Sequence, residues 1–362
     1  MLVKRTFQPE ATRGVALTAA GVLLVASTYG MARFGVGLLH PAMAVERPGV
    51  ARALPSAGAA QFASYCVAAG LAGFLVPARS RAVAGAAGVV AGLGCLGLAL
   101  STSAGWFVAS AYVSGAGAGL ASPALVGLLD AVVPERMAGA AQAVVNSGTS
   151  VGVVMTGMLA TAVTAPGPAW LLMAVACLAT CGAVVVLSSG ATVVDAATGP
   201  VRPSRRSPGR TASWALPLTL AVGAGVTSAA VWTFGPTVVV GRGALQPEQV
   251  GLLWTALGVG GLAGAFVAGP VARHGPTKAF VLCTVALLVG SVAVLAPRGD
   301  EGTWPLVGAA CFGAGYMSMS GVLILWGRLL DPRGGAAATA WLFIALAVGQ
   351  AVGSHALGAV FA

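Results

Sequence analysis

The chain has 362 residues, of which 57% are hydrophobic and only 8% are charged, and its mean hydropathy is +0.91. A water-soluble domain carries about a quarter charged residues, so this composition excludes a soluble globular protein. The net charge of +10 does not indicate nucleic-acid binding, because the basic residues lie in short segments between apolar runs. We therefore expect an all-α integral membrane protein surrounded by a lipid bilayer.

Eleven apolar runs are long enough to cross a bilayer as helices, for which about 20 residues suffice. They lie at approximately 14–39, 56–77, 82–101, 104–130, 137–163, 168–189, 212–240, 248–270, 278–297, 303–330 and 335–362. The stretch 191–211 is rich in Arg and Pro and predicts a cytoplasmic basic linker. It would separate an N-terminal six-helix bundle, residues 1–190, from a C-terminal bundle of five helices, residues 212–362.

The basic residues also predict the orientation of these spans. Of the 19 Lys and Arg residues, 14 lie in the segments on the side of the N-terminus, four lie on the opposite side, and Arg33 lies inside a span. Such a bias is typical of an N-terminus in the cytoplasm of a cell-membrane protein. With an odd number of spans, the C-terminus is expected outside.

Glycine patterns in the two halves indicate an internal repeat, because each recurs about 200 residues later. The matched patterns are Gly148-x3-Gly152-x4-Gly157 with Gly349-x3-Gly353-x4-Gly358, Gly115-Ala-Gly117 with Gly313-Ala-Gly315, and Phe34-Gly35 with Phe234-Gly235. Two bundles of like architecture follow, the second without a sixth helix.

Arg33 is the most informative single residue. It lies about six residues from the outer end of the span 14–39, roughly 9 Å below that surface. An arginine at this depth normally faces a bundle interior or a watery cavity, and Tyr29, Gly37 and His40 share its helical face. We expect Arg33 to bind an anionic or hydrogen-bond-accepting substrate, and since no Asp or Glu lies deep in any span, an anion would serve as its counter-ion. The alternative is a structural arginine that binds carbonyls or reaches toward the outer surface.

Two other residues are candidates for proton coupling. Asp130 lies at the cytoplasmic end of the span 104–130, and His355 lies in the last span. A proton carried by the solute itself is the third option, and a packing role between helices is the alternative for His355.

Signatures of catalysis are missing from the sequence. We find no H-E-x-x-H, G-x-S-x-G or Walker A pattern, and the six cysteines lie within apolar runs without metal-ligand spacing. We therefore expect no enzyme activity, no cofactor and no metal.

Three segments resemble known patterns of the major facilitator superfamily. YGMARFGVGLLHPAM (29–43) resembles the first helix of its YbfB/YjiJ-like branch, and GQAVGSHALG resembles a GQ-x-x-G pattern. The loop with Arg273, Gly275 and Lys278 resembles the inner-loop motif of the superfamily, with Ala272 in place of its acidic residue.

This resemblance implies a two-bundle fold of six and five helices, in which the twelfth helix of the family is missing. In that family, helices one, four, seven and ten line a central cavity. The residues that would face it here are Arg33, Tyr29, Tyr112, Trp232 and Tyr316. The implied function is secondary active transport of a small organic solute by alternating access. The alternative is a non-transporting membrane sensor or scaffold, which the missing helix and the degenerate loop motif would favour.

Overall fold

The computed structural model describes residues 4–189, 213–296, 303–331 and 335–361, and all its regular elements there are helical. The first half contains α1 (Lys4–Val25), η1 (Ala26–Arg33), α2 (Gly35–Glu46), η2 (Pro48–Val50), α3 (Leu54–Leu100), α4 (Ala104–Val132), α5 (Glu135–Ala162) and α6 (Pro166–Leu187). The second half contains α7 (Ala215–Ala229), η3 (Ala230–Phe234), α8 (Gly235–Gly241), η4 (Pro247–Gln249), α9 (Val250–Gly261), η5 (Leu262–Phe266), α10 (Ala268–His274), α11 (Pro276–Leu295), α12 (Thr303–Leu330), α13 (Gly335–Ala356) and α14 (Gly358–Phe361).

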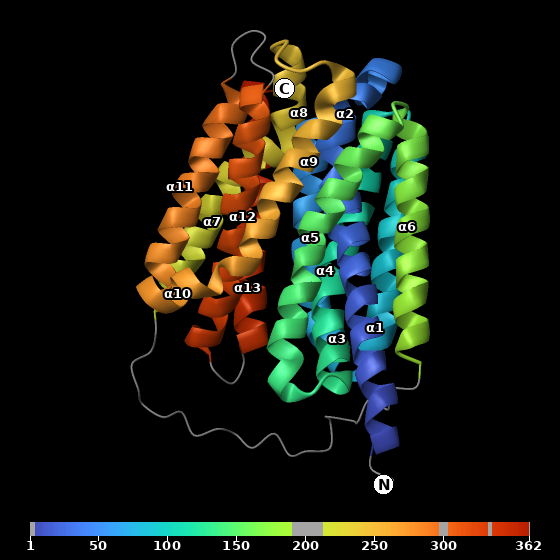
Figure 1. The fold of residues 1–362 in the computed structure, drawn as a ribbon. Coiled ribbons are helices and arrows are strands. Elements are labelled where there is room, and N and C mark those ends of the chain that lie inside the picture. The colour runs from blue at the N-terminus through green and yellow to red at the C-terminus, as the bar shows by residue number, and fades with distance from the viewer. Residues whose placement is uncertain (1–3, 190–212, 297–302, 332–334, 362) are drawn as a thin grey trace.

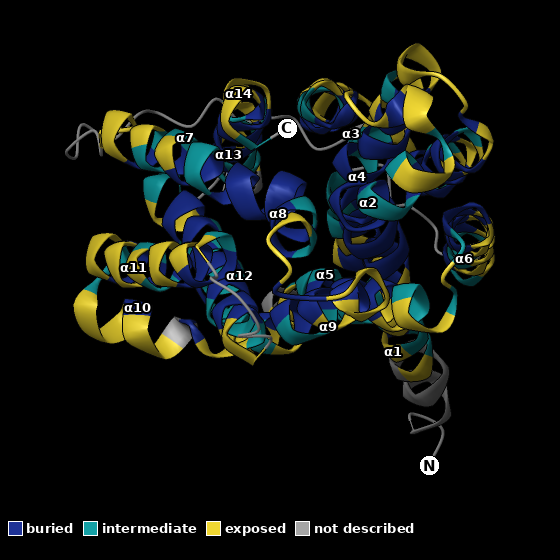
Figure 2. Cartoon of the chain, turned by 90° about the horizontal axis from the view of Figure 1, so that it is seen from above, coloured by how far each residue is buried: buried dark blue, intermediate teal, exposed yellow. Residues whose placement is uncertain are grey.

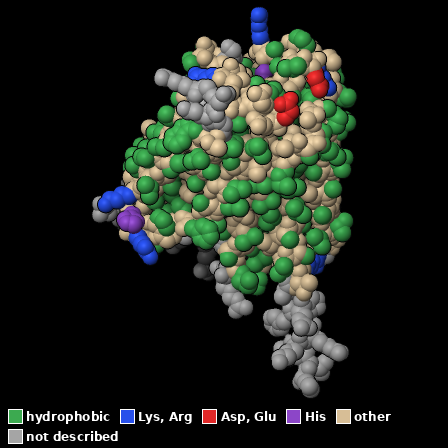
Figure 3. Space-filling model, turned by 45° about the horizontal axis from the view of Figure 1, so that its top comes forward, with side chains coloured by type: hydrophobic (Ala, Val, Ile, Leu, Met, Phe, Trp, Pro, Cys, Tyr) green, Lys and Arg blue, Asp and Glu red, His purple; other side chains and the backbone are tan. Residues whose placement is uncertain are grey.

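Within these described ranges, eleven helical segments are long and apolar enough to cross a membrane, which confirms the predicted all-α membrane class and the number of spans. Two spans share the element α3, which changes direction at Arg79, where φ is −146° and ψ is 33°. The chain is a multi-pass membrane protein. Figure 3 shows the matching surface, with charged side chains near the ends of the molecule and mainly hydrophobic and uncharged ones between them.

The helices form two groups (Figure 1). Helices α1 and α3–α6 lie on one side, and α7 and α10–α13 lie on the other. The groups meet where α5 packs against α9 and where α3 packs against α13. Figure 2 shows that the buried residues face inward between the groups. The predicted linker 191–211 lies outside the described residues, and the bundle limits at 190 and 212 stay a prediction.

The two chain ends lie at opposite ends of the molecule (Figure 1), as an odd number of crossings requires. Which end faces the cytoplasm stays a prediction from the basic residues.

The glycine triplets of the two halves make equivalent contacts. A methyl group on Gly152 would meet the carbonyl oxygen of Ala26, and one on Gly353 would meet that of Val226. In each half the triplet therefore lets a later helix, α5 or α13, pack directly on the backbone of the first helix of that half. Close backbone approach at small residues is typical of helix packing in membranes.

The first span differs from the prediction in length. Instead of ending at residue 39, its helix continues through α2 to Glu46 and includes Pro41. Arg33 therefore lies 13 residues before the end of the helix, about 20 Å along its axis, instead of about six residues before it. The extension is possible because α2 packs against α8 of the other half and is covered by it.

Candidate functional site

The site begins with a change of helical geometry in the middle of the first span. From Ala26 to Arg33 the backbone forms wide π turns, and the N–H of Phe34 donates to the carbonyl of Tyr29, five residues earlier, at 3.2 Å. The first helix of the second half makes the same change over Ala230–Phe234. Such π segments are rare and frequently occur at functional sites. Their matched positions place Arg33 and Trp232 at corresponding levels of the two halves.

Side chains from other helices hold the first π segment in place. Ser114 donates to the carbonyl of Ala32 at 2.9 Å, and Thr156 donates to that of Gly30 at 3.2 Å. The indole N–H of Trp254 donates to the carbonyl of Phe34, also at 3.2 Å. These bonds matter because backbone groups inside a membrane protein must find partners within the protein.

The guanidinium of Arg33 lies at the centre of the molecule, and the residue is only 2% exposed. Its Cζ atom lies 4.3 to 5.2 Å from the centroids of four rings, those of Tyr29, Phe34, Phe62 and Tyr65. One terminal nitrogen donates to the Oε1 atom of Gln350 at 3.1 Å. The aromatic cage and the amide come from opposite halves, so Arg33 joins them.

No described carboxylate pairs with this cation. Its Nε atom is buried and makes no hydrogen bond in the described structure, although an arginine offers five donors. The indole Nε1 of Trp232 and the amide Oε1 of Gln61 are also buried and without a partner there. Buried polar groups normally have partners, so a buried cation with a free donor, close in the chain or through Phe34 to two further unpaired polar side chains, is a candidate binding site.

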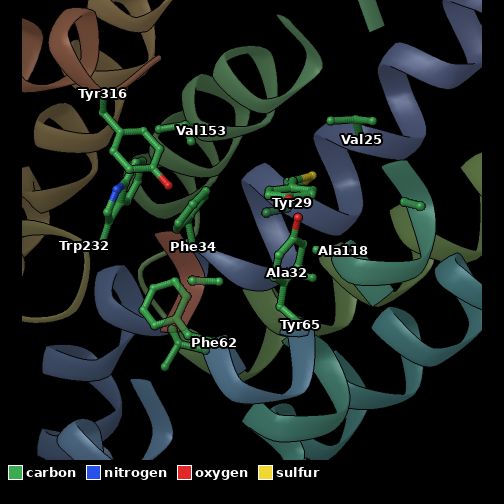
Figure 4. Close-up of a cluster of buried hydrophobic side chains, with 14 of the residues drawn as sticks. Val25, Tyr29, Ala32, Phe34, Phe62, Tyr65, Ala118, Val153, Trp232 and Tyr316 are labelled. Carbon is green, nitrogen blue, oxygen red and sulfur yellow. The ribbon is translucent and has the colours of Figure 1, made fainter. Parts of the chain in front are cut away.

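An aromatic cluster of the second half adjoins the cage. The ring of Trp232 stacks on that of Phe34, with centroids 3.8 Å apart and an angle of 18°. Trp232 also contacts Tyr316 at 5.2 Å, and Gln350 donates to the Tyr316 hydroxyl at 3.1 Å. Figure 4 shows Phe34, Trp232 and Tyr316 on one side of the buried cluster and Tyr29 and Tyr65 on the other.

The structure brings together four of the five residues expected to face a cavity, namely Arg33, Tyr29, Trp232 and Tyr316. It does not bring Tyr112 to them. Tyr112 is 42% exposed and lines an open surface depression with Arg52 and Ser56.

The expected polar stripe on the first helix is only partly present, because the π turns change the spacing of its side chains. Tyr29 and Arg33 face each other, whereas Gly37 lies against the carbonyl of Trp232. His40 instead contacts the carbonyl of Val50 at 3.3 Å.

Neither candidate for proton coupling is among the groups that contact Arg33. His355 is exposed on α13. Asp130 is exposed at the end of α4, where the positive charge of Arg328 from the second half acts on it. Asp130 and Arg328 occupy equivalent positions of the repeat.

The loop with the Arg-x-Gly core joins α10 to α11. Gly275 has φ of 78°, a conformation that favours glycine, and α11 begins at the next residue. Arg273 and Lys278 are exposed beside it. The local geometry explains why this spacing needs a glycine.

Several site residues were not predicted as such. Gln350, Tyr65 and Gln61 are not among the candidates named above, because a polar side chain within a span commonly serves helix packing. Phe34 and Phe62 gave no signal, because an aromatic residue in an apolar run is ordinary. The GQ-x-x-G resemblance was the one signal that could have identified Gln350.

The comparisons with known proteins agree with this architecture. The model of the Major Facilitator Superfamily matches residues 14–354. The chain belongs to this superfamily. No curated protein sequence matches the chain.

Solved structures of transporters share the fold at low sequence identity. The nucleoside transporter NupG has a TM-score of 0.70 at 11% identity, over 96% of this chain and 90% of that one. The xylose transporter XylE from E. coli, in a partially occluded inward open conformation, has a TM-score of 0.70 at 13% identity, over 96% and 92%. A D-xylose-proton symporter has a TM-score of 0.69 at 16% identity, over 95% and 89%.

This member of the superfamily is a membrane transporter of a small molecule and not an enzyme. At these identities the structural likeness shows the fold alone. The assignment to the YbfB/YjiJ-like branch stays a prediction.

Proposed function

We propose that the protein is a secondary active transporter that moves a small organic anion across the cell membrane by alternating access, with Arg33 as the anchor. The observation that carries this proposal is the guanidinium itself. It is buried between the halves, its Nε atom has no partner, and no described carboxylate balances its charge.

The groups around Arg33 offset only part of the cost of burying it. Each cation–π contact stabilises the guanidinium by about 0.5–2 kcal/mol, and a neutral amide adds one hydrogen bond. Neither carries negative charge, whereas an isolated charge within a membrane is expensive. A carboxylate can accept two parallel bonds from Nε and a terminal nitrogen, so it would complete the site.

A solute reaches Arg33 only when the two halves separate. Contacts that cross between them surround the site: Phe34 with Trp232, Arg33 with Gln350, and the indole of Trp254 with the Phe34 carbonyl. The halves also meet at glycines, as at Gly157 against Gly251. Smooth small-residue surfaces on α3, α5, α9 and α13 would let the halves rock about a fixed midplane site.

We further propose that the N-terminus lies in the cytoplasm, with Arg273 and Lys278 on the same side. Asp130 and His355 are exposed, and neither contacts Arg33, so we do not assign either of them the exchange of a proton with its ligand. A proton that is co-transported would then travel on the solute.

The test is uptake of radiolabelled organic acids into proteoliposomes by the wild type, Arg33→Ala and Arg33→Lys. Removing a hydrogen-bonded buried charge costs about 2 kcal/mol or more, so we expect Arg33→Ala to weaken affinity at least thirtyfold. Arg33→Lys should recover little, because an ammonium lacks the planar fork.

Arg47→Ala is the matched control. Arg47 donates to the carbonyls of Ala99 and Ser101, so its loss should lower thermal stability without changing affinity. Equal affinity of Arg33→Ala and wild type would remove Arg33 from the site. Absence of flux for every solute, with the protein folded, would favour a sensor or scaffold.

A further inference from the structure

The side chains around Arg33 also restrict the chemistry of the ligand, on the premise that the proposed function is correct. The cage and its surroundings hold one cation, and the polar atoms without a partner are few: Nε of Arg33, Nε1 of Trp232 and Oε1 of Gln61. A sugar or polyol has many hydroxyl groups and would leave most of them unpaired among these rings. Unpaired buried polar groups are costly, so the site does not fit a polyol.

The charge of the site points to a single negative charge on the ligand. Arg33 is fully buried, and no other Lys or Arg belongs to the buried residues of the described chain. A dicarboxylate or a phosphate ester dianion would bring a second charge without a partner into the same apolar surroundings. A buried charge that lacks a partner is strongly unfavourable, so a monoanion fits best.

The walls of the site are flat and aromatic. Phe34 belongs to the first half and Trp232 to the second, and their nearly parallel rings are the stacked pair that joins the halves. When the halves separate, both ring faces become free. The guanidinium of Arg33 lies 5.2 Å from the Phe34 ring centroid, so an anion bound to it would be adjacent to these faces.

We infer that the ligand is an aromatic monocarboxylate whose carboxylate binds Arg33 and whose ring enters between Phe34 and Trp232. Offset-stacked rings are favoured geometries for aromatic groups, and a ring held from both sides contacts both halves at once. The ligand would thereby replace the contacts that join the halves when they are closed.

The experiment uses the full-length protein in detergent, with radiolabelled benzoate as the probe. Competitors are cyclohexanecarboxylate, which is not flat, phthalate, which carries a second negative charge, and benzamide, which carries none. We expect benzoate to bind about fivefold to tenfold more tightly than cyclohexanecarboxylate, given the value of an aromatic pair. Benzamide and phthalate should compete weakly.

Two variants separate the parts of the inference. Phe34→Leu keeps apolar volume but removes the ring, so the preference for benzoate over cyclohexanecarboxylate should disappear. Trp232→Phe keeps an aromatic face on the second half, so it should retain the preference that Phe34→Leu loses. Phe74→Leu is the control, because Phe74 lies on α3 with 85% of its surface exposed and should leave this preference unchanged.

Absence of benzoate binding, or equal binding of cyclohexanecarboxylate by the wild type, would overturn the inference. Arg33-dependent transport of aliphatic acids in that case would leave the proposed function standing. Binding and flux that do not change in Arg33→Ala would instead overturn the proposed function.

Discussion

The first helices of the two halves have the same order of helical conformations but different side chains at matched positions. Each passes from α to π turns and returns to α beside a Phe-Gly pair. At matched positions, the first half has Ala32 and Arg33 where the second has Trp232 and Thr233. The fourth helices differ likewise, with Ala118 in the first half where the second has Tyr316.

The two halves therefore share the backbone conformation of their first helices and differ in the side chains that those helices carry. Both halves share the π segment within their first helix. The side chains differ because one cation in the centre needs large rings opposite it and small residues beside it. A symmetric fold thus holds an asymmetric site.

Exchanging the side chains of the two π segments should have the largest effect. In Arg33→Thr with Thr233→Arg, the cation would move to a position where the Thr233 hydroxyl now contacts Ser354 at 2.9 Å. Thr233 packs against Ser354 and against the helix at Gly58, so an arginine there would have to displace these close contacts. We expect anion uptake to fall more than a hundredfold, since about 2.7 kcal/mol corresponds to that factor. Thr233→Val is the control and should transport normally, whereas restored uptake by the exchanged protein would show that the halves are interchangeable.

Supplying the cation with a permanent partner should also abolish transport. Gln350→Glu has the same shape and would place a carboxylate beside Arg33, where Gln350 now lies at 3.1 Å. An ion pair in low dielectric that joins the halves should raise the thermal midpoint and weaken anion binding, with a coupling of about 2 kcal/mol or more. The measurements are detergent unfolding curves and benzoate displacement, with Gln142→Glu on α5 as the control. Unchanged affinity would contradict Arg33 as the anchor.

Enlarging the matched glycines tests whether the shared backbone is equally tight in both halves. A methyl carbon on Gly353 would lie 2.6 Å from the carbonyl oxygen of Val226, and one on Gly152 would lie closer still to that of Ala26. We expect both alanine variants to lose about 1–3 kcal/mol of stability by overpacking, with the larger loss for Gly152→Ala. An added methyl group on Gly70 would meet no atom within 4 Å, so Gly70→Ala should lose no stability. Thermal unfolding measures all three variants. Equal midpoints for all three would refute the equivalent packing.

Removing one hydroxyl should have the smallest effect. Tyr316→Phe keeps the ring contacts with Trp232 but removes the acceptor of the Gln350 amide. The loss is one hydrogen bond, about 1 kcal/mol or roughly fivefold in affinity for the anion. A much larger loss would indicate that the hydroxyl binds the ligand directly.

Hydropathy, basic residues and glycine spacing predicted the eleven spans, the repeat and the buried arginine. These features are local or periodic, so the chain shows them without a structure. The helix ends were predicted less accurately, and the first helix extends to Glu46. The α8 residues that pack against this extension lie about 200 residues later in the chain, so the local sequence does not show the contact.

The sequence by itself determined that this protein lies in a membrane as two similar halves. It also determined that Arg33 lies within a span, where a charged side chain needs partners. Only the tertiary structure decided which residues surround it. Gln350 lies 317 residues from Arg33, and the orientation of Tyr112 was equally invisible. In a soluble helix the polar face reveals the outside, but lipid and protein interior are both apolar. Sequence periodicity therefore cannot distinguish a ring that faces lipid from one that faces the site.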